Sequence, residues 1–200
     1  MRLIIATNNK DKFREIRKIL SSLKLEILCL KDLDKKFNIR EDKKTFFENA
    51  LKKAITISKV YKDDLVVGED SGLVVDYIYP RPGVYSKRYA GKNTTYLKNN
   101  LKLLRELEGV KFKDRGAKFI CSVVLARNAK LIKSFEGSVR GFISEKIKGD
   151  NGFGYDPVFY LPKFKKTFAE LPLGVKNKIS HRAKAFNLLK KYLKKYILMV

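Results

Sequence analysis

The sequence is poor in several residue types on which common functional sites depend. Its 200 residues contain one histidine, His181, and two cysteines. A single histidine excludes a metal site built from several histidines, and neither Cys29 nor Cys121 has a Cys or His neighbour at metal-ligand spacing. Both cysteines lie inside apolar runs, so we expect buried, reduced thiols that pack as small apolar groups.

Long apolar runs are also missing. No stretch is long enough to span a bilayer, and the apolar start RLIIAT is too short for a secretory signal. We find no internal repeat and no low-complexity segment. With 44% hydrophobic residues, the chain has enough apolar material for one core. We therefore expect a soluble, cytoplasmic protein without membrane contact, folded as one domain over residues 1–200.

Acidic residues are scarce relative to basic ones, with 21 Asp and Glu against 45 Lys and Arg and a formal net charge of +24. The electrostatic field of so basic a protein attracts polyanions, among them nucleic acid, anionic membrane surfaces and small phosphorylated substrates. The lysines are scattered along the chain, which is typical of solvated faces. A basic nucleic-acid-binding protein stays open as an alternative, because charge alone favours nucleic acid no more than a nucleotide.

Apolar periodicity predicts an α/β fold with a mixed sheet flanked by helices. The expected strands cover residues 3–7, 25–30, 65–70 and 72–78, with an antiparallel pair at 118–128 and 131–143. The Gly- and Pro-rich loop GDNGFGYDPVFYLP is expected to lead into a further short strand. The expected helices cover residues 8–23, 46–61, 96–107 and 179–200. The two strands of GEDSGLVVD are expected to meet at a Ser71–Gly72 turn.

Two carboxylates interrupt this apolar region. Glu69 and Asp70 follow a buried strand, and strand ends of α/β sheets are where ligand crevices form. Together with Glu48, in the first turns of the second helix, Asp70 has the chemistry of a Mg²⁺ site. The alternative is structural: Glu48 near a helix N-terminus and Glu69 and Asp70 as turn residues.

The segment ATNNKDK connects the first strand to the first helix. Free N–H groups at a helix N-terminus bind anions, and Lys10 and Lys12 add positive charge that phosphates accept. The alternative is that Thr7 or Asn8 caps the helix and the lysines are solvated. The segment lacks the glycines of a Walker-type loop.

Two later segments carry weaker signals. In GFGYDP, Phe153 or Tyr155 could stack on a base and Asp156 could bind its edge, although an ordinary tight turn explains the same residues. In ISHRA, Ser180 is a natural N-cap and His181 stands beside Arg182, but a lone histidine is more often structural.

Taken together, TNNKDK, FFENA, EDSGLVVD, PGVYSKRYAG, GFGYDP and ISHRA occur in the order and spacing that resemble the inosine/xanthosine triphosphate pyrophosphatase family, from Leu3 to about Phe186. The resemblance implies an elongated mixed α/β fold with two lobes and a central cleft, usually as a homodimer. It also implies Mg²⁺-dependent hydrolysis of ITP, dITP or XTP to the monophosphate and pyrophosphate. A related-fold pyrophosphatase acting on pyrimidine or modified nucleotides is the closer rival.

The resemblance also assigns roles to residues. Asp70 and Lys12 are implied as catalytic, and Glu48 and Asp70 as Mg²⁺ ligands. The implied substrate-binding residues are Thr7, Asn8, Asn9, Lys10, Asp11, Lys12, Ser71, Lys87, Phe153, Gly154, Tyr155, Asp156, Lys176, His181 and Arg182. Within this set, the resemblance implies Thr7, Asn9 and Lys12 as the phosphate-binding loop. It implies residues 153–156 as the base pocket, with Lys176, His181 and Arg182 as its other wall.

Overall fold

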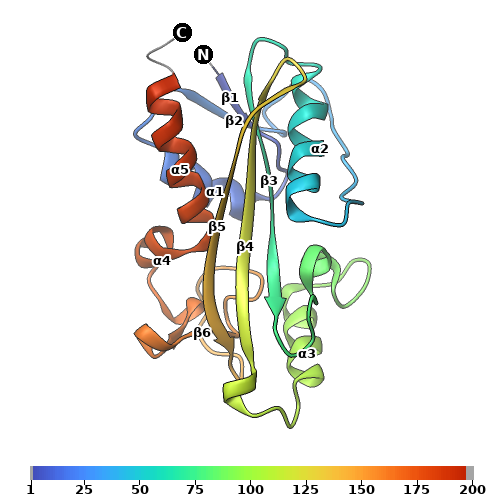
Figure 1. The fold of residues 1–200 in the computed structure, drawn as a ribbon, viewed down its shortest axis with the longest axis vertical. Helices are drawn as coiled ribbons and strands as arrows, with labels where there is room; N and C mark the ends of the chain where they lie inside the picture. Colours follow the sequence, from blue (N-terminus) through green and yellow to red (C-terminus); the bar gives the residue numbers. More distant parts are fainter. Residues whose placement is uncertain (1, 197–200) are drawn as a thin grey trace. The chain divides into compact units, whose positions relative to one another are not determined.

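The computed structural model describes residues 2–196 and has an α/β fold (Figure 1). Its strands form one seven-stranded sheet in the order β2-β1-β3-β4-β5-β6-β7. β1 runs parallel to β2 and β3, whereas β6 runs antiparallel to β5 and β7. The prediction of a mixed sheet flanked by helices is therefore confirmed.

The elements follow one another as β1 Arg2–Ile5, α1 Lys10–Leu20, β2 Glu26–Cys29, α2 Phe46–Ser58, β3 Leu65–Val75, η1 Gly83–Arg88, α3 Tyr96–Glu106, η2 Phe112–Asp114, β4 Gly116–Arg127, β5 Lys130–Ile143, β6 Phe159–Leu161, η3 Pro162–Phe164, β7 Lys166–Thr167, η4 Phe168–Glu170, α4 Leu173–Ile179 and α5 His181–Tyr196.

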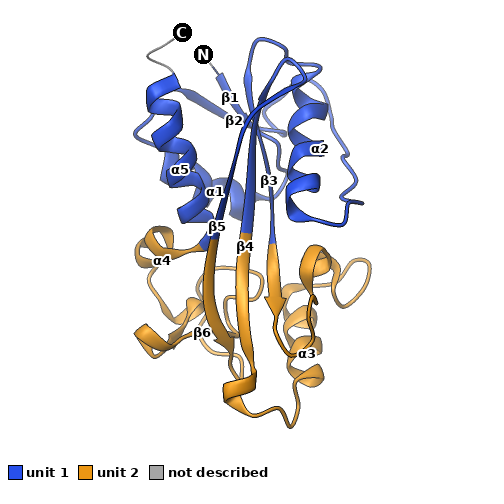
Figure 2. Ribbon diagram, viewed as in Figure 1, with its two compact units in different colours: residues 1–71, 121–137, 181–200 blue, residues 72–120, 138–180 orange. Residues whose placement is uncertain are grey.

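The chain divides into two compact units (Figure 2). Unit 1 comprises residues 1–71, 121–137 and 181–200, and unit 2 comprises residues 72–120 and 138–180. The boundaries fall inside β3, β4 and β5, so each of these strands contributes residues to both units.

Unit 1 is layered, because successive side chains of a strand point to opposite faces. Leu65 and Val67 of β3 pack in one cluster with residues of α1 and α5, whereas Val66 packs in another with Ile57 of α2. Figure 1 shows α1 and α5 on one side of these strands and α2 on the other. This alternation decides which helix each polar residue further along β3 can reach.

Unit 2 has a separate core rich in aromatic residues. Phe159 stacks on Phe168 with ring centroids 5.2 Å apart, and Phe119 lies 4.6 Å from Phe159. α3 contributes Leu103 to the same cluster. Such offset and tilted aromatic contacts add to the free energy gained from burial.

The turn predicted at Ser71–Gly72 is wrong. β3 is one continuous strand of 11 residues, Leu65–Val75, and ten of them are buried. A Ser-Gly pair after two acids is typical of a turn, but here it lies in mid-strand. Glu69 and Asp70 therefore lie within the sheet and not at a strand end.

Other local predictions are confirmed. The β4 and β5 strands are neighbours joined by a two-residue turn, in which Asn128 and Ala129 both have positive φ, 48° and 59°. This is the connection that links antiparallel hairpin strands. Cys29 and Cys121 are buried and free. Among the helices of residues 2–196, none combines the length and apolarity needed to cross a membrane.

Gly68 of β3 lies directly against α2. A Cβ at this position would lie 1.9 Å from the Ala50 carbonyl oxygen and 2.8 Å from the Ala54 amide nitrogen, both backbone atoms. We expect Gly68→Ala to lower the free energy of unfolding by about 2–4 kcal/mol, because neither backbone atom can move without displacing the helix. Gly174→Ala is the control, since its Cβ would meet nothing within 4 Å. Thermal unfolding followed by circular dichroism measures both; equal midpoints would contradict the prediction.

Candidate active site

The segment between β1 and α1 folds as a helix cap with exposed polar neighbours. Asn9 is the N-cap: its Oδ1 accepts hydrogen bonds from the backbone N–H groups of Asp11 and Lys12, at 2.9 and 3.1 Å. The Thr7 hydroxyl accepts from the Asn9 backbone at 3.1 Å. Asn8 and Lys10 are exposed at the same end of α1. The cap predicted as an alternative is thus present, but at Asn9 and not at Thr7 or Asn8.

Glu69 is the centre of a buried charge cluster in unit 1. The strand pleat points it toward α1 and α5, where Lys12 Nζ lies 2.8 Å from Oε2 and Arg182 Nη2 lies 3.2 Å from Oε1. Arg182 also contacts Glu15 Oε2 at 2.6 Å and donates to the Ser71 hydroxyl at 2.9 Å. Glu69 is 1% exposed and Arg182 2%. Two cations and two carboxylates thus neutralise one another.

These contacts shift the pKa values of the cluster. Burial by itself would raise the pKa of Glu69, but the charges of Lys12, Arg182 and Lys53 together hold it well below the ordinary value. Burial would likewise lower the pKa of Arg182, and the two carboxylates more than offset it. The Cys121 thiol lies 3.5 Å from Glu69, and burial together with this carboxylate raises its pKa well above normal. Cys121 is therefore held as a neutral thiol.

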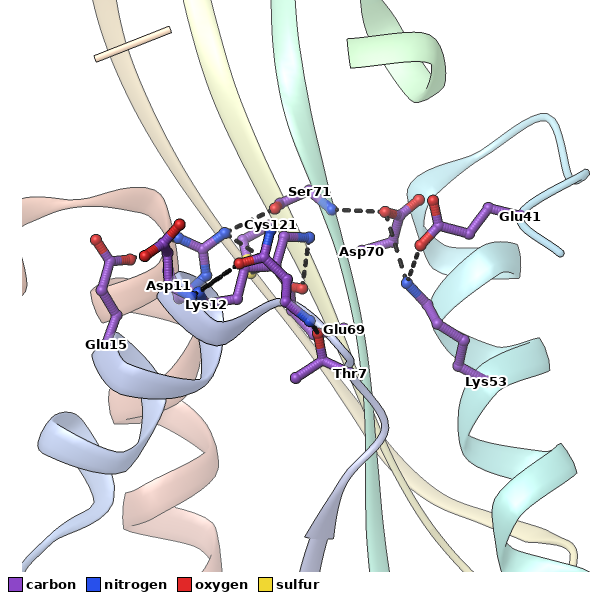
Figure 3. Close-up of polar contacts among 12 residues, drawn as sticks. Thr7, Asp11, Lys12, Glu15, Glu41, Lys53, Glu69, Asp70, Ser71 and Cys121 are labelled. Atoms are coloured by element: carbon purple, nitrogen blue, oxygen red, sulfur yellow. Dashed lines mark hydrogen bonds and ion pairs between the residues drawn. The ribbon is translucent and has the colours of Figure 1, made fainter. Parts of the chain in front are cut away.

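Asp70, the next residue, points to the opposite face of β3 and meets α2. Its Oδ1 accepts from the Ser71 backbone at 3.0 Å and lies 3.7 Å from Lys53 Nζ, which in turn lies 2.8 Å from Glu41 (Figure 3). Asp70 is 5% exposed. Within residues 2–196 its Oδ2 is buried and has no hydrogen-bond partner. A carboxylate oxygen in this position is one that a bound cation or a water molecule would satisfy.

Burial raises the pKa of Asp70, and the nearby carboxylates of Glu41 and Glu69 act in the same direction. The charges of Lys53 and Lys12 oppose this shift in part. A carboxylate with a raised pKa is a better proton acceptor near neutral pH. Glu69 and Asp70, adjacent in sequence, therefore have opposite pKa shifts.

Glu48 is engaged elsewhere. It completes a capping box, in which its carboxylate accepts from the backbone and hydroxyl of Thr45 at 3.1 and 2.8 Å. The side chain is exposed. The helix-terminal role considered as the alternative for Glu48 is therefore present, and Glu41 is the carboxylate that the structure places beside Lys53 and Asp70. Across residues 2–196, no group of three or more His, Cys, Asp and Glu residues is arranged to hold a metal.

The GFGYDP segment, in unit 2, is ordered by Asp156. Its Oδ2 accepts from the Phe153 backbone at 2.7 Å and from the ammonium of Lys176. The same ammonium lies 4.7 Å from the centroid of the Phe153 ring. Gly152 is required here, because it has φ of 78° and a Cβ would lie 2.1 Å from Asp156 Oδ2. Asp156 thus fixes Phe153 and Lys176 instead of presenting a free edge.

Tyr155 connects this segment to the one that carries Lys87. Its hydroxyl donates to the Ser86 carbonyl oxygen at 2.9 Å, and burial raises its pKa. Asn99 of α3 donates to the carbonyl oxygens of Ser86 and Lys87 at 3.4 and 3.2 Å. Lys87 itself is exposed on η1. Tyr155 therefore acts as an anchor within the structure. Nothing in the sequence pattern indicates this contact.

The predicted site residues form one group in each unit. Those in unit 1 are Thr7, Asn8, Asn9, Lys10, Asp11, Lys12, Glu48, Asp70, Ser71, His181 and Arg182, and those in unit 2 are Lys87, Phe153, Gly154, Tyr155, Asp156 and Lys176. His181 is 4% exposed as the first residue of α5. Sequence analysis missed Glu15 and Glu41 and gave no role to Lys53, because only the fold brings them to Arg182 and Asp70.

Comparisons with known proteins agree on one family. The sequence model of the Ham1 family matches residues 3–192. A dITP/XTP pyrophosphatase of Clostridium tetani is 44% identical, covering 98% of this chain and 97% of its own length, and one of Bacillus licheniformis is 48% identical, covering 92% and 93%. The Ham1 protein of Staphylococcus aureus has the same fold, with a TM-score of 0.87, 37% identity and coverage of 98% and 100%.

Replacing Glu69 tests the charge cluster. Glu69→Gln leaves Lys12 and Arg182 with less negative charge, so we expect a loss of about 3 kcal/mol of stability at pH 7. The lowered pKa of Glu69 stabilises the fold above its ordinary value of 4.5, and this contribution disappears as pH falls through the folded-state value. The difference between variant and wild type should therefore shrink in acid. Urea unfolding from pH 7 to pH 3, with the exposed Glu108→Gln as control, measures it; a difference independent of pH would refute this account.

Proposed function

Because this chain belongs to the Ham1 family, we propose that it hydrolyses non-standard purine nucleoside triphosphates (ITP, dITP and XTP) to the monophosphate and pyrophosphate. The observation that carries the proposal is the arrangement around Asp70. A buried carboxylate with a free oxygen and a raised pKa lies beside Glu41 and Lys53. The names of the similar proteins, dITP/XTP pyrophosphatases, support the substrate class.

The phosphates are assigned to the N-terminus of α1. Lys12 is mostly buried and held in place by Glu69, so its ammonium is preorganised as a charged donor. The proposed phosphate contacts are Thr7, Asn8, Asn9, Lys10, Asp11, Lys12 and Ser71. Thr7 to Lys10 also border a cavity of about 510 Å³, whose lining includes the cations Arg14, Arg17, Lys18 and Lys31. Excess positive charge beside a helix N-terminus suits a polyphosphate.

The residues present fit a divalent cation. Asp70 offers a buried oxygen without a partner. The ammonium of Lys53 is shared by two carboxylates, those of Asp70 and Glu41, so negative charge is in excess at this point. Hard oxygen donors of this kind favour Mg²⁺. Asp70 would hold the ion with Glu41 or Glu48, and Glu41 fits better because Glu48 is committed to its capping box. When bound, the ion supplies positive charge that neutralises the triphosphate.

Asp70 is the proposed proton acceptor for the attacking water, in keeping with its raised pKa. Water attacks the α-phosphorus, the bond to the bridging oxygen breaks, and pyrophosphate leaves with its charge stabilised by Lys12 and the helix N-terminus. The proposed base contacts lie in the segment of Phe153, Gly154, Tyr155 and Asp156, which Tyr155 and Asp156 hold in place. Lys176, His181 and Arg182 are the other proposed base contacts, and Lys87 is the further phosphate contact.

The proposed selectivity between purine bases follows from the hydrogen-bond donors and acceptors at position 6 of the base. Hypoxanthine and xanthine present a 6-oxo acceptor, whereas adenine presents a 6-amino donor. Lysine and arginine offer only donors, so Lys176 and Arg182 suit the oxo form and leave adenine unpaired. A site built on such hydrogen bonds can reject the wrong partner by about 10⁴-fold. Guanine shares the oxo group and must be rejected at its 2-amino group.

The proposal also includes a homodimer that acts in the cytoplasm, and the family resemblance is the support for both statements.

The reaction is tested by pyrophosphate release from ITP, XTP, GTP and ATP with and without Mg²⁺. We expect kcat/KM for ITP and XTP to exceed that for ATP by about 10³- to 10⁴-fold. Asp70→Asn should lower kcat by about 10⁴-fold, because it removes the proton acceptor. The exposed Asp63→Asn is the matched control. Turnover of Asp70→Asn near that of wild type would refute the assignment, and no turnover of any purine triphosphate by wild type would refute the function.

The second metal ligand is tested by comparing two glutamates. Glu41→Gln should raise the Mg²⁺ concentration for half-maximal activity by about 10-fold or more, because it removes a negatively charged oxygen beside Asp70. Glu48→Gln keeps the capping box, because a glutamine side chain also accepts from the N-cap backbone; it should cost about 0.5 kcal/mol through the lost charge at the helix N-terminus, with an unchanged Mg²⁺ dependence. Mg²⁺ titrations of activity and thermal unfolding separate the two. The reverse pattern would place the ion at Glu48.

A further inference from the structure

An aromatic residue outside the predicted site lies against the GFGYDP segment. Tyr96, the first residue of α3, has its ring centroid 6.0 Å from that of Phe153, with an angle of 41° between the planes. Tyr96 is 40% exposed. The proposed hydrolysis gives Tyr96 no role so far.

The position of Tyr96 is fixed by a second contact one turn along the helix. Asn100 donates from Nδ2 to the Gly154 carbonyl oxygen at 3.0 Å and is 2% exposed. Residues four apart lie on the same face of a helix, so Tyr96 and Asn100 face the segment together. Thr95 caps this end of α3, because its hydroxyl accepts from the Lys98 backbone at 3.2 Å. Tyr96 is thus held beside Phe153 by the helix start and by the Asn100 contact.

The surroundings of Phe153 limit where a base can stack. The Lys176 ammonium lies 4.7 Å from the ring centroid and engages one face. The tilt of 41° means that the Tyr96 ring does not lie flat on Phe153. The two rings therefore meet at an angle, and Tyr96 lies near enough to Phe153 to extend its aromatic surface.

We propose that Tyr96 is a further substrate-binding residue that provides a second aromatic surface for the purine base. This inference rests on the proposed function, which places the base at Phe153. Stacking does not distinguish one purine from another, since every base has a π-face. Tyr96 would therefore strengthen binding of base-bearing ligands as a class and leave the selection of the 6-oxo group to the hydrogen-bonding residues.

The test compares Tyr96→Ala, Tyr96→Phe and, as control, Leu97→Ala at the next and more exposed position of α3. For Tyr96→Ala we expect KM for ITP to rise about 5- to 30-fold with kcat within about twofold, because stacking helps substrate and transition state equally. Tyr96→Phe keeps the ring and should stay within about twofold of wild type, as should Leu97→Ala.

Two inhibitors separate a base contact from a general disturbance. IMP carries the base, so its inhibition constant should rise in Tyr96→Ala in parallel with KM. Inorganic tripolyphosphate has no base, and its inhibition constant should not change. An unchanged KM for ITP in Tyr96→Ala, or an equal loss of IMP and tripolyphosphate binding, would overturn the role of Tyr96 while wild-type turnover upholds the proposed function. Absence of ITP turnover by wild type would overturn both.

Discussion

The buried carboxylate of Glu69 is the interaction on which the charged residues of unit 1 depend. It is 1% exposed and has Lys12 on one oxygen and Arg182 on the other. Removing two cations and two carboxylates from water carries a large desolvation cost, which is offset only when each charge has a close partner. Glu15 completes that balance through Arg182. The cluster also connects α1, β3 and α5, so it fixes the candidate phosphate residue Lys12 relative to the strand.

Because successive side chains of β3 point to opposite faces, the adjacent residues Glu69 and Asp70 have different chemical environments. Glu69 follows Leu65 and Val67 toward α1 and α5, whereas Asp70 follows Val66 and Gly68 toward α2. Opposite faces give these neighbours different environments: close cations lower the pKa of Glu69, whereas burial raises the pKa of Asp70 and the more distant Lys53 offsets this only in part. One carboxylate is thereby kept ionised as a structural anchor, and the other is available as a metal ligand and proton acceptor.

The sequence predicted what depends on local chemistry and missed what depends on distant packing. The helix after β1 and the β4–β5 turn follow from residues within a few positions, and both were predicted. A cap before that helix was predicted too, but at Thr7 or Asn8 and not at Asn9, where the structure has it. The continuous β3 was missed because Ser71–Gly72 carries a turn signal, which is overridden by the place of β3 beside the long strand β4 in the sheet. Glu41 was missed because it lies in a segment without helix or strand periodicity. Its contact with Lys53 is what places it near Asp70. Tyr155 has the composition of a base contact, yet its hydroxyl binds the Ser86 carbonyl oxygen.

The distribution of charge differs between the two units, and it is consistent with phosphate contacts in unit 1 and base contacts in unit 2. In unit 1, the balanced cluster around Glu69 leaves the cations Lys10, Arg14, Arg17, Lys18 and Lys31 at the cavity beside the phosphate loop, which suits a polyanion. In unit 2, Asp156 and Lys176 are each 2% exposed and neutralise each other beside the Phe153 ring. A neutral, aromatic environment suits a purine base, which gains more from stacking than from net charge. The position of Tyr96 next to that ring extends the aromatic surface without adding charge, and that is the property a base site requires.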